Sequence, residues 1–421
     1  MSLVSQDPAI SQILAQELQR QQTELNLIAS ENYADPLVLA VTGSILTNKY
    51  AEGYPGKRYY GGCQFVDQAE RLAIERAQQL FQAPHVNVQP HSGSSANLAA
   101  YFSVLQPGAK ILGLRLSEGG HLTHGHQVSF SGKFYQALSY GVDPETEQID
   151  YQALEQLVAQ QRPQLLVCGA SAYARTLDFA KLAAIAHAHQ ALLLADIAHI
   201  AGLVATGLHP SPINHADIVT STTHKTLRGP RGGLIMSRIE LAEQIDKAVM
   251  PGVQGGPLVH VIAAKAVAFA LALQPAFKQY QQQVLTNAQV MARTLAELGY
   301  RIVSGGTDTH LFLVDLRLQN LTGLAAEKAL GAAGITVNRN CIPGDPEKPW
   351  ITSGIRLGTP AMTTRGMREP EAQEIAGLIH EALQHHNQPH KLALIKMRVL
   401  TLCTLFGLPY QQATSSSRAI A

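Results

Sequence analysis

The centre of the chain alternates between short apolar segments and segments with helical spacing of apolar residues. Mostly apolar residues occupy positions 165–167, 192–195, 218–220 and 233–237, without the polar alternation of a half-exposed strand. A helical pattern at 179–189 separates the first two. Since strands buried on both faces need cover on both sides, this pattern predicts a mainly parallel sheet between layers of helices.

The residues before this region predict a helical arm and an ordered loop. Residues 1 to about 25 are Gln-rich and mildly amphipathic, as in a helix. Residues 30–62 are dense in Tyr, Gly and Pro with little periodicity, which indicates an ordered loop around a short helix. Apolar residues return at helical spacing over 67–81.

The residues after the centre predict a smaller α+β region. Helical patterns cover 263–272 and 284–298, and apolar strand patterns follow at 301–303, 312–315 and 335–338. We therefore expect an N-terminal arm over 1–30, a large domain over 31–275 and a small C-terminal domain over 276–421. The last dozen residues, with the serine run at 415–417, are expected to be frayed.

Composition excludes several classes of protein. The chain has 421 residues, 46% hydrophobic and 15% charged, as in a compact enzyme of two or three domains. A net charge of +1 gives no reason to expect nucleic acid or an anionic membrane as partner. No apolar run is long enough for a membrane span, no signal peptide is expected, and the four cysteines are scattered. We expect a cytoplasmic protein without a metal site.

Lys225 is the first candidate for chemistry. It follows a β-branched run and four hydroxyl residues, and the chain then breaks into Gly and Pro. The nearest charges are Arg228 and Arg231, and neighbouring positive charge lowers the pKa of a lysine, which makes a nucleophilic amine more accessible. Such a lysine is suited to a covalent bond with a carbonyl compound or with pyridoxal phosphate. An ordinary lysine at the end of a strand fits these residues equally well.

Two further segments favour pyridoxal phosphate. Asp196 ends an apolar run, and a buried carboxylate there needs a cationic partner, such as a protonated pyridine nitrogen. The segment 91–97, His-Ser-Gly-Ser-Ser-Ala-Asn, precedes a helical stretch and can hold a phosphate on backbone N–H groups and hydroxyls. No Gly-Lys-Ser/Thr follows it, which disfavours a nucleotide-binding P-loop.

At this point the chain resembles the serine hydroxymethyltransferases, folate-dependent enzymes of the aspartate-aminotransferase-like group that uses pyridoxal phosphate. The resemblance covers about residues 20 to 400. The matching segments are Leu27–Asn32, Asn48–Gly62, His91–Asn97, Gly119–Gly125, Leu192–His199, Asp217–Gly233, Gln254–Pro257 and Ser353–Pro360. Several of these segments are long and unusual in composition, which argues against a chance match.

The resemblance implies a fold and a reaction. The fold is the α/β pyridoxal phosphate-dependent transferase fold, fold type I, with a mainly parallel seven-stranded sheet in a large domain and a smaller C-terminal α+β domain. The reaction is the reversible transfer of the serine hydroxymethyl group to tetrahydrofolate, which gives glycine and 5,10-methylenetetrahydrofolate. This reaction belongs to one-carbon metabolism and amino-acid biosynthesis.

The resemblance also implies the site residues. Lys225 holds pyridoxal 5'-phosphate covalently, and Lys225, Glu52 and His224 are the catalytic residues. Further cofactor contacts are Tyr50, Gly93, Ser94, His121, Ser171, Asp196, His199, Gly255 and Gly256. The substrate contacts are Ser30, Tyr60 and Arg356, with Arg356 on the carboxylate. The contacts to tetrahydrofolate, the co-substrate, are Leu116, Gly120 and Asn340.

The resemblance further implies a homodimer with shared active sites, or a tetramer built from it. Tyr50, Glu52, Gly255 and Gly256 are expected to act in the partner's site. The chain departs from the family pattern at Ser221, Val253 and Gly344, and of these Val253 and Gly344 put only folate-side and interface details in doubt.

Alternatives remain open. On the same scaffold they are a threonine or allo-threonine aldolase and an α-methylserine hydroxymethyltransferase. From another class, the alternative is a catalytically silent binding protein, which the residues Lys225, Asp196, Glu52 and Arg356 argue against.

Overall fold

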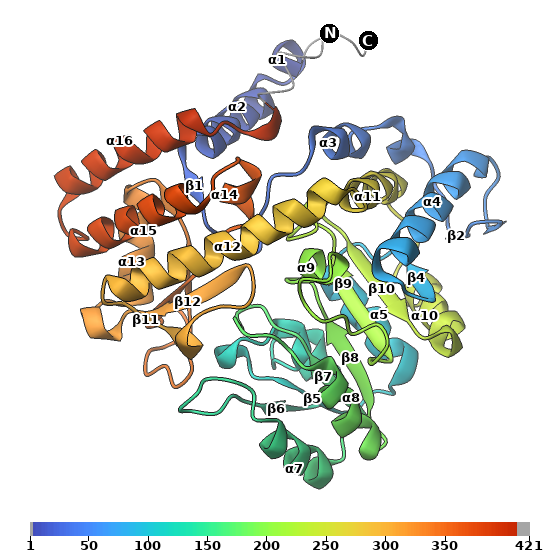
Figure 1. Cartoon of the computed structure of the whole chain (residues 1–421). Helices are drawn as coiled ribbons and strands as arrows, with labels where there is room; N and C mark the ends of the chain where they lie inside the picture. The colour runs from blue at the N-terminus through green and yellow to red at the C-terminus, as the bar shows by residue number, and fades with distance from the viewer. Residues whose placement is uncertain (1–2, 411–421) are drawn as a thin grey trace.

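The computed structural model describes residues 3–410, and a seven-stranded sheet lies at its centre (Figure 1). The strand order is β4-β10-β9-β8-β7-β5-β6. Strand β10 runs antiparallel to β9 and β4, and the other neighbouring pairs are parallel, so the prediction of a mainly parallel sheet is confirmed. The strands are β4 (His85–Asn87), β5 (Lys110–Leu114), β6 (Gln136–Tyr140), β7 (Leu165–Cys168), β8 (Leu192–Asp196), β9 (Ile218–Thr222) and β10 (Gly233–Ser237).

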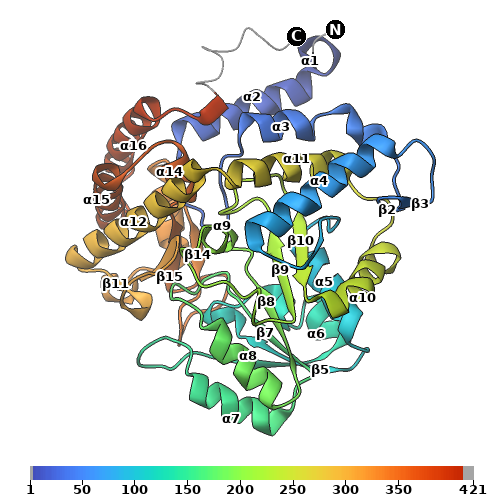
Figure 2. The ribbon, with the colours of Figure 1, turned by 45° about the vertical axis from the view of Figure 1, so that its right-hand side comes forward.

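Alternate side chains of the central strands enter two separate cores, one on each face of the sheet. Leu166 and Leu193 pack with Phe269 on one face, whereas Leu165 and Leu194 pack with Tyr101 on the other. Because both faces are covered, the strands are apolar at nearly every position. The covering helices include α4 (Gln64–Phe81), α5 (Gly93–Val104), α7 (Tyr151–Gln161), α8 (Phe179–Ala188), α10 (Ala242–Lys247) and α11 (Val259–Ala272). Figure 2 shows α4 and α11 side by side.

A second, antiparallel sheet follows in the chain. Its order is β11-β12-β15-β14, and it shares a core with α12, α13, α15 and α16. This confirms the α+β region expected after residue 300. The elements are α12 (Pro275–Glu297), β11 (Arg301–Ile302), β12 (Leu311–Asp315), α13 (Gly323–Ala332), β14 (Asn338–Asn340), β15 (Gly354–Gly358), α14 (Pro360–Thr364), α15 (Glu369–Gln384) and α16 (Pro389–Leu405).

The single strand expected over 335–338 is wrong, because the segment divides between two sheets. Strand β13 (Ile335–Thr336) pairs in parallel with β1 (Leu25–Asn26), and Asn338 begins β14. The amide of Leu27 donates to the Thr336 carbonyl over 2.9 Å. The end of the N-terminal arm is therefore joined to the C-terminal part of the chain.

The arm and the loop before the sheet match their predictions. The arm forms α1 (Leu3–Gln6) and α2 (Pro8–Thr23), and α2 buries none of its residues. The loop contains the expected short helix, α3 (Pro36–Thr42), and a hairpin of β2 (Gly53–Tyr54) and β3 (Lys57–Arg58). Short helices α6 (Phe130–Phe134) and α9 (Ala201–Ala205) complete the α-helices of residues 3–410.

Helix α12 connects the two cores. Phe277 and Leu285 pack in the core of the large sheet, whereas Met291 and Leu295 pack in that of the small sheet. Figure 1 shows α12 extending from beside β11 and β12 toward α11. The domain boundaries at 30 and 275 stay a prediction, and the expected frayed serines at 415–417 lie outside the described residues.

No single helix within residues 3–410 is long and apolar enough to cross a membrane. Helices α11 and α12 pass that test only as a pair, which is bent by 82°.

Candidate active site

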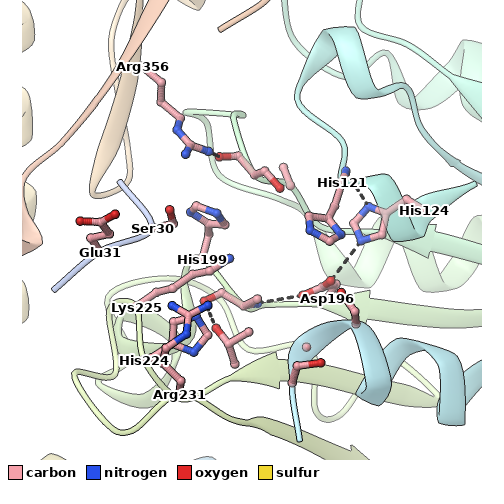
Figure 3. Close-up of a pocket in the computed structure, with 17 residues that line it drawn as sticks. Ser30, Glu31, His121, His124, Asp196, His199, His224, Lys225, Arg231 and Arg356 are labelled. Carbon is pink, nitrogen blue, oxygen red and sulfur yellow. Dashed lines mark hydrogen bonds and ion pairs between the residues drawn. The ribbon is translucent and has the colours of Figure 1, made fainter. Parts of the chain in front are cut away.

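A cavity of about 470 Å³ lies at the carboxyl ends of β8 and β9 (Figure 3). Parallel α/β sheets bind ligands at this edge. The cavity brings together ten of the predicted residues: Ser30, Gly93, Ser94, His121, Ser171, Asp196, His199, His224, Lys225 and Arg356. Seven further lining residues are Glu31, Ser92, His124, Ala170, Ala198, Thr222 and Arg231.

Asp196, the last residue of β8, is held by three donors. Its Oδ2 accepts hydrogen bonds from Asn97 Nδ2 at 2.9 Å and His124 Nε2 at 3.1 Å, and its Oδ1 accepts one from the Ala198 amide at 3.0 Å. Burial alone would raise the pKa of this carboxyl, but the interactions with His124 and Asn97 outweigh it and lower the pKa well below its usual value. Asp196 is therefore an anion fixed in the cavity wall.

Lys225 lies three residues beyond β9 and is half-buried. Burial, the largest cause, lowers the pKa of its amine to about 8; Asp196 opposes the shift, and Arg356 and Arg231 add to it. Within residues 3–410 the amine has no hydrogen bond or ion pair. The Lys225 carbonyl accepts from Asn32 Nδ2 at 3.1 Å, which fixes the main chain while the amine stays available.

The expectation that Arg228 lowers this pKa is wrong. Arg228 donates from Nε to the Tyr33 carbonyl over 2.9 Å, and its guanidinium lies over the Tyr280 ring. Arg356, far away in the chain, takes its place. Residues close in sequence, such as Lys225 and Arg228, can point in different directions at the end of a strand. Arg356 lies far away in the chain, but its strand β15 brings it to the cavity.

The amino end of α5 forms another wall. Ser92 is its N-cap and exchanges hydrogen bonds with Ser95. A Cβ on Gly93 would lie 2.7 Å from Thr222 Cγ2, so only glycine lets this turn approach β9 so closely. Opposite lies His224, whose buried Nδ1 has no hydrogen-bond partner among the described residues. Free helix N–H groups, Ser94, Arg231 and an unpaired imidazole nitrogen suit a phosphate.

Three histidines in the cavity are neutral. Burial, followed by the charge of Arg231, lowers the pKa of His224 to about 3. Burial, followed by His124, lowers the pKa of His121 to about 4, and its Nδ1 lies 2.6 Å from Thr123 Oγ1. Burial also lowers the pKa of His199, whose ring stacks on that of His310 with centroids 5.5 Å apart. A neutral His121 offers an uncharged flat face to a bound aromatic ring.

Arg356 brings a cation without a counter-ion. Its Nε donates to Asn338 Oδ1 at 3.1 Å and its Nη1 to the Ser171 carbonyl at 2.7 Å. Burial lowers its pKa to about 10. In the described part of the chain no carboxylate forms an ion pair with it, so the guanidinium is oriented but not neutralised.

A second cluster of predicted residues lies outside this cavity. Tyr50 donates to Glu52 Oε1 at 3.2 Å, and its ring meets that of Tyr60 edge-on, 5.1 Å between centroids. A Cβ on Gly255 would lie 3.0 Å from Glu52 Oε1, and one on Gly256 would lie 3.3 Å from Tyr50 Cζ. None of the five lines the 470 Å³ cavity of its own chain.

A neighbouring cavity of about 370 Å³ shares His121 and His124 with the first. Of the predicted folate contacts, Leu116 lines it. Gly120 and Asn340 do not; Gly120 packs on the Leu114 carbonyl, and Asn340 donates Nδ2 to the Cys341 carbonyl at 2.7 Å.

The family follows from comparison with known proteins. A family model described as serine hydroxymethyltransferase matches residues 3–379. A serine hydroxymethyltransferase of Koribacter versatilis (strain Ellin345) is 56% identical over 414 residues, 98% of this chain and 97% of the relative. The serine hydroxymethyltransferase of Alkalilimnicola ehrlichii (strain ATCC BAA-1101 / DSM 17681 / MLHE-1) is 55% identical over 414 residues, 98% of this chain and 99% of the relative. That of Cyanothece sp. (strain PCC 7425 / ATCC 29141) is 58% identical over 410 residues, 96% of this chain and 96% of the relative.

The chain belongs to the serine hydroxymethyltransferase family.

Membership confirms the predicted family, the fold class and the function as a serine hydroxymethyltransferase enzyme, since this family uses the fold type I scaffold and pyridoxal phosphate. The alternative of a silent binding protein loses its support with it. The roles of individual residues remain predictions.

Two residues that touch Asp196 were not assigned from the sequence. Asn97 lies on α5 and His124 in a short turn, and both stand inside segments that carried the resemblance. Their spacing held the signal: His124 comes three residues after His121, and Asn97 one helical turn after Gly93, which brings each pair to one side of its turn.

His121, His124 and Asp196 also offer nitrogen and oxygen atoms within 4.8 Å of one another, a set that could hold a metal ion. The Asp196 carboxylate already accepts three hydrogen bonds. The carboxylate therefore has little acceptor capacity left. This favours one further hydrogen-bond donor to Asp196 over a metal ion bound jointly with His121 and His124.

Proposed function

We propose that the 470 Å³ cavity holds pyridoxal phosphate bonded to Lys225, and that with it this serine hydroxymethyltransferase transfers the serine hydroxymethyl group to tetrahydrofolate. One observation carries the assignment: a buried carboxylate at the end of β8 and an amine of lowered pKa just beyond the parallel strand β9 face the same cavity. Such a pair matches the two ends of the cofactor that need an anion and a nucleophile.

The surroundings fit the rest of the cofactor. The amino end of α5, with Ser94, supplies donors for the phosphate, and His224 lines the same cavity. Neutral His121 supplies a flat face for the ring. When bound, pyridoxal phosphate supplies the electron sink for a bond broken at the substrate α-carbon.

Asp196 keeps a proton on the ring nitrogen. Its carboxylate is fixed by Asn97, His124 and the Ala198 amide, so it needs no rearrangement to meet a positive charge. Lys225 would hold the cofactor covalently, because at a pKa of about 8 part of its amine is neutral and nucleophilic near physiological pH.

Arg356 binds the substrate carboxylate. Contacts with Asn338 and the Ser171 carbonyl orient its guanidinium, which still lacks an anion. A carboxylate on Arg356 fixes how the α-carbon is presented to the cofactor, and Ser30 lies on the same side of the cavity in Figure 3.

The second cluster completes the site of a partner subunit. Tyr50, Glu52, Tyr60, Gly255 and Gly256 lie together outside the cavity of their own chain. Tyr50 and Tyr60 are 56% and 49% exposed, which is high for groups that bind ligand in a monomer. In a twofold dimer each chain would give this cluster to the other, with Glu52 moving the hydroxyl proton of the substrate.

The 370 Å³ cavity is the place for tetrahydrofolate. It opens beside His121 and is lined by Leu116, Cys341 and Pro349. A ligand in this cavity would reach the substrate past the His121 side chain. Gly120 and Asn340 do not line the cavity and would act on the ligand only through the residues that do.

An assay of serine cleavage with and without tetrahydrofolate tests the proposal, together with an absorbance spectrum of the purified protein. Cleavage that depends on tetrahydrofolate, with a visible absorption band that Lys225→Gln alters, is expected. Threonine cleavage faster than serine transfer, or a protein without such a band in the presence of pyridoxal phosphate, would contradict it.

A further inference from the structure

Lys265, on α11, is a buried cation that the proposed chemistry does not use. Its side chain is 1% exposed, and its Nζ donates to three main-chain carbonyls: Val88 at 2.7 Å, Pro90 at 3.1 Å and Gly233 at 2.7 Å. No carboxylate forms an ion pair with it within the described residues. An unpaired buried charge is costly, so a structural reason for keeping it is needed.

The three acceptors require the ammonium form. A lysine ammonium has three N–H donors and a neutral amine has two. Burial lowers the pKa of Lys265 to about 7, and the charge of Glu70 opposes that shift. With three carbonyls converging on one nitrogen, the site has the form of a small monovalent-cation site built from main-chain oxygens, as in potassium filters.

These carbonyls stand where two strands separate. The ladder between β4 and β10 ends at the pair Asn87–Ile235. Beyond it, the chain of β4 turns into the loop that leads to Ser92 and α5, and Pro90 has no N–H with which to continue a ladder. Beyond the ladder, the Gly233 amide still donates to the Pro90 carbonyl over 2.9 Å, and Lys265 adds three side-chain hydrogen bonds to this main-chain link.

Both segments border the phosphate end of the cavity. One leads through Pro90 to Ser92, Gly93 and Ser94; the other follows Arg231, which lines the cavity. The contact is close, because a Cβ on Gly232 would lie 2.5 Å from Lys265 Cε. Gln254 adds a second tie, accepting from the His91 amide and donating to the Gln89 carbonyl.

We infer that Lys265 is a positioning residue for the phosphate-binding loop, and that its ammonium fills a cation site formed by the Val88, Pro90 and Gly233 carbonyls. It touches neither cofactor nor substrate and acts through the loop at 90–94. The inference rests on the proposed function, because that loop matters only if a phosphate binds there.

The test compares pyridoxal phosphate with pyridoxal, which lacks the phosphate. Cofactor-free wild type, Lys265→Ala and the exposed-lysine control Lys278→Ala are titrated with each ligand in choline, potassium and ammonium chloride at equal ionic strength. We expect Lys265→Ala in choline to bind pyridoxal phosphate at least tenfold more weakly, and pyridoxal less than threefold more weakly. Potassium or ammonium, but not bulky choline, should restore most of the loss. Wild type and control should not respond to the cation.

Equal losses for the two ligands, an unchanged affinity for pyridoxal phosphate, or a loss that no cation reverses would overturn the inference. If Lys265→Ala does not fold, Gly232→Ala takes its place, because its methyl group would displace the lysine while the charge is kept. It should narrow the affinity ratio of pyridoxal phosphate to pyridoxal, and an unchanged ratio overturns the inference. A wild type that binds no pyridoxal phosphate contradicts the proposed function itself.

Discussion

Replacing Arg356 with alanine should abolish tight binding of the amino acid and leave the cofactor in place. The guanidinium is oriented by Asn338 and the Ser171 carbonyl, and no carboxylate among residues 3–410 forms an ion pair with it. Truncating one partner of a desolvated charge pair costs about 2–5 kcal/mol. Since about 1.4 kcal/mol corresponds to a factor of ten, serine affinity should fall roughly thirtyfold to a few thousandfold.

The assay separates the carboxylate from the rest of the substrate. Serine and ethanolamine, which keeps the amine and hydroxyl but lacks the carboxylate, are each titrated against wild type and Arg356→Ala while the cofactor spectrum is followed. Ethanolamine binding should change less than threefold. Arg398→Ala is the control, because that arginine forms an exposed ion pair with Glu381 on the outside of α15 and α16. Equal losses for serine and ethanolamine would refute the assignment of Arg356 to the carboxylate.

Three other predictions follow from the same cavity. Capture of pyridoxal phosphate by cofactor-free protein should accelerate as pH rises through about 8, since Lys225 is protonated below that pKa and neutral above it; stopped-flow absorbance measures this. Asn97→Ala should cost about 1–3 kcal/mol of stability at pH 7, because Asp196 loses a donor. Since the folded pKa of Asp196 is lowered, the difference in melting temperature should shrink as pH falls below about 4. Inactive Lys225→Gln and inactive Glu52→Gln should regain activity when mixed under subunit exchange, with about a quarter of sites complete.

Each of these has a contrary outcome. A capture rate that keeps rising up to pH 10 would show an ordinary lysine. A stability difference for Asn97→Ala that persists unchanged into acid would mean that the amide does not act through Asp196. A mixture as inactive as its parts, despite proven exchange, would place Glu52 and Lys225 in one chain.

The sequence was most informative where one segment determines its own structure. The apolar strand ending in Asp196 and the one leading to Lys225 could be located because burial on both faces leaves a continuous apolar run. Their meeting at one edge then follows from the geometry of parallel sheets. The resemblance supplied Arg356, which no local pattern would connect with Lys225 across more than a hundred residues.

Contacts between distant segments were not accessible in this way. The division of 335–338 between two sheets depends on β1, some 310 residues earlier in the chain. The sequence around Ile335 does not indicate that it pairs with β1. The contacts of Lys265 could not be predicted either. Its neighbours in an Ala-rich helix indicate an ordinary core position, and the three carbonyls around its nitrogen come from distant segments. Arg228 shows the converse error, since closeness in sequence was taken for closeness in space.

The pairing of β1 with β13 brings two of the predicted substrate contacts to one side of the cavity. The Gly358 amide donates to the Leu27 carbonyl over 2.9 Å, and a Cβ on Gly358 would lie 2.4 Å from Ala29 Cα. Ser30 is thus held beside β15, the strand that carries Arg356. Asp196 and Lys225, by contrast, lie at the ends of strands of the large sheet. Two further hydrogen bonds, from Asn32 to the Lys225 carbonyl at 3.1 Å and from Arg356 to the Ser171 carbonyl at 2.7 Å, connect these substrate contacts to the part of the chain that carries Lys225. The distance from the substrate carboxylate site to the reactive amine is therefore set by main-chain contacts on both sides of the cavity.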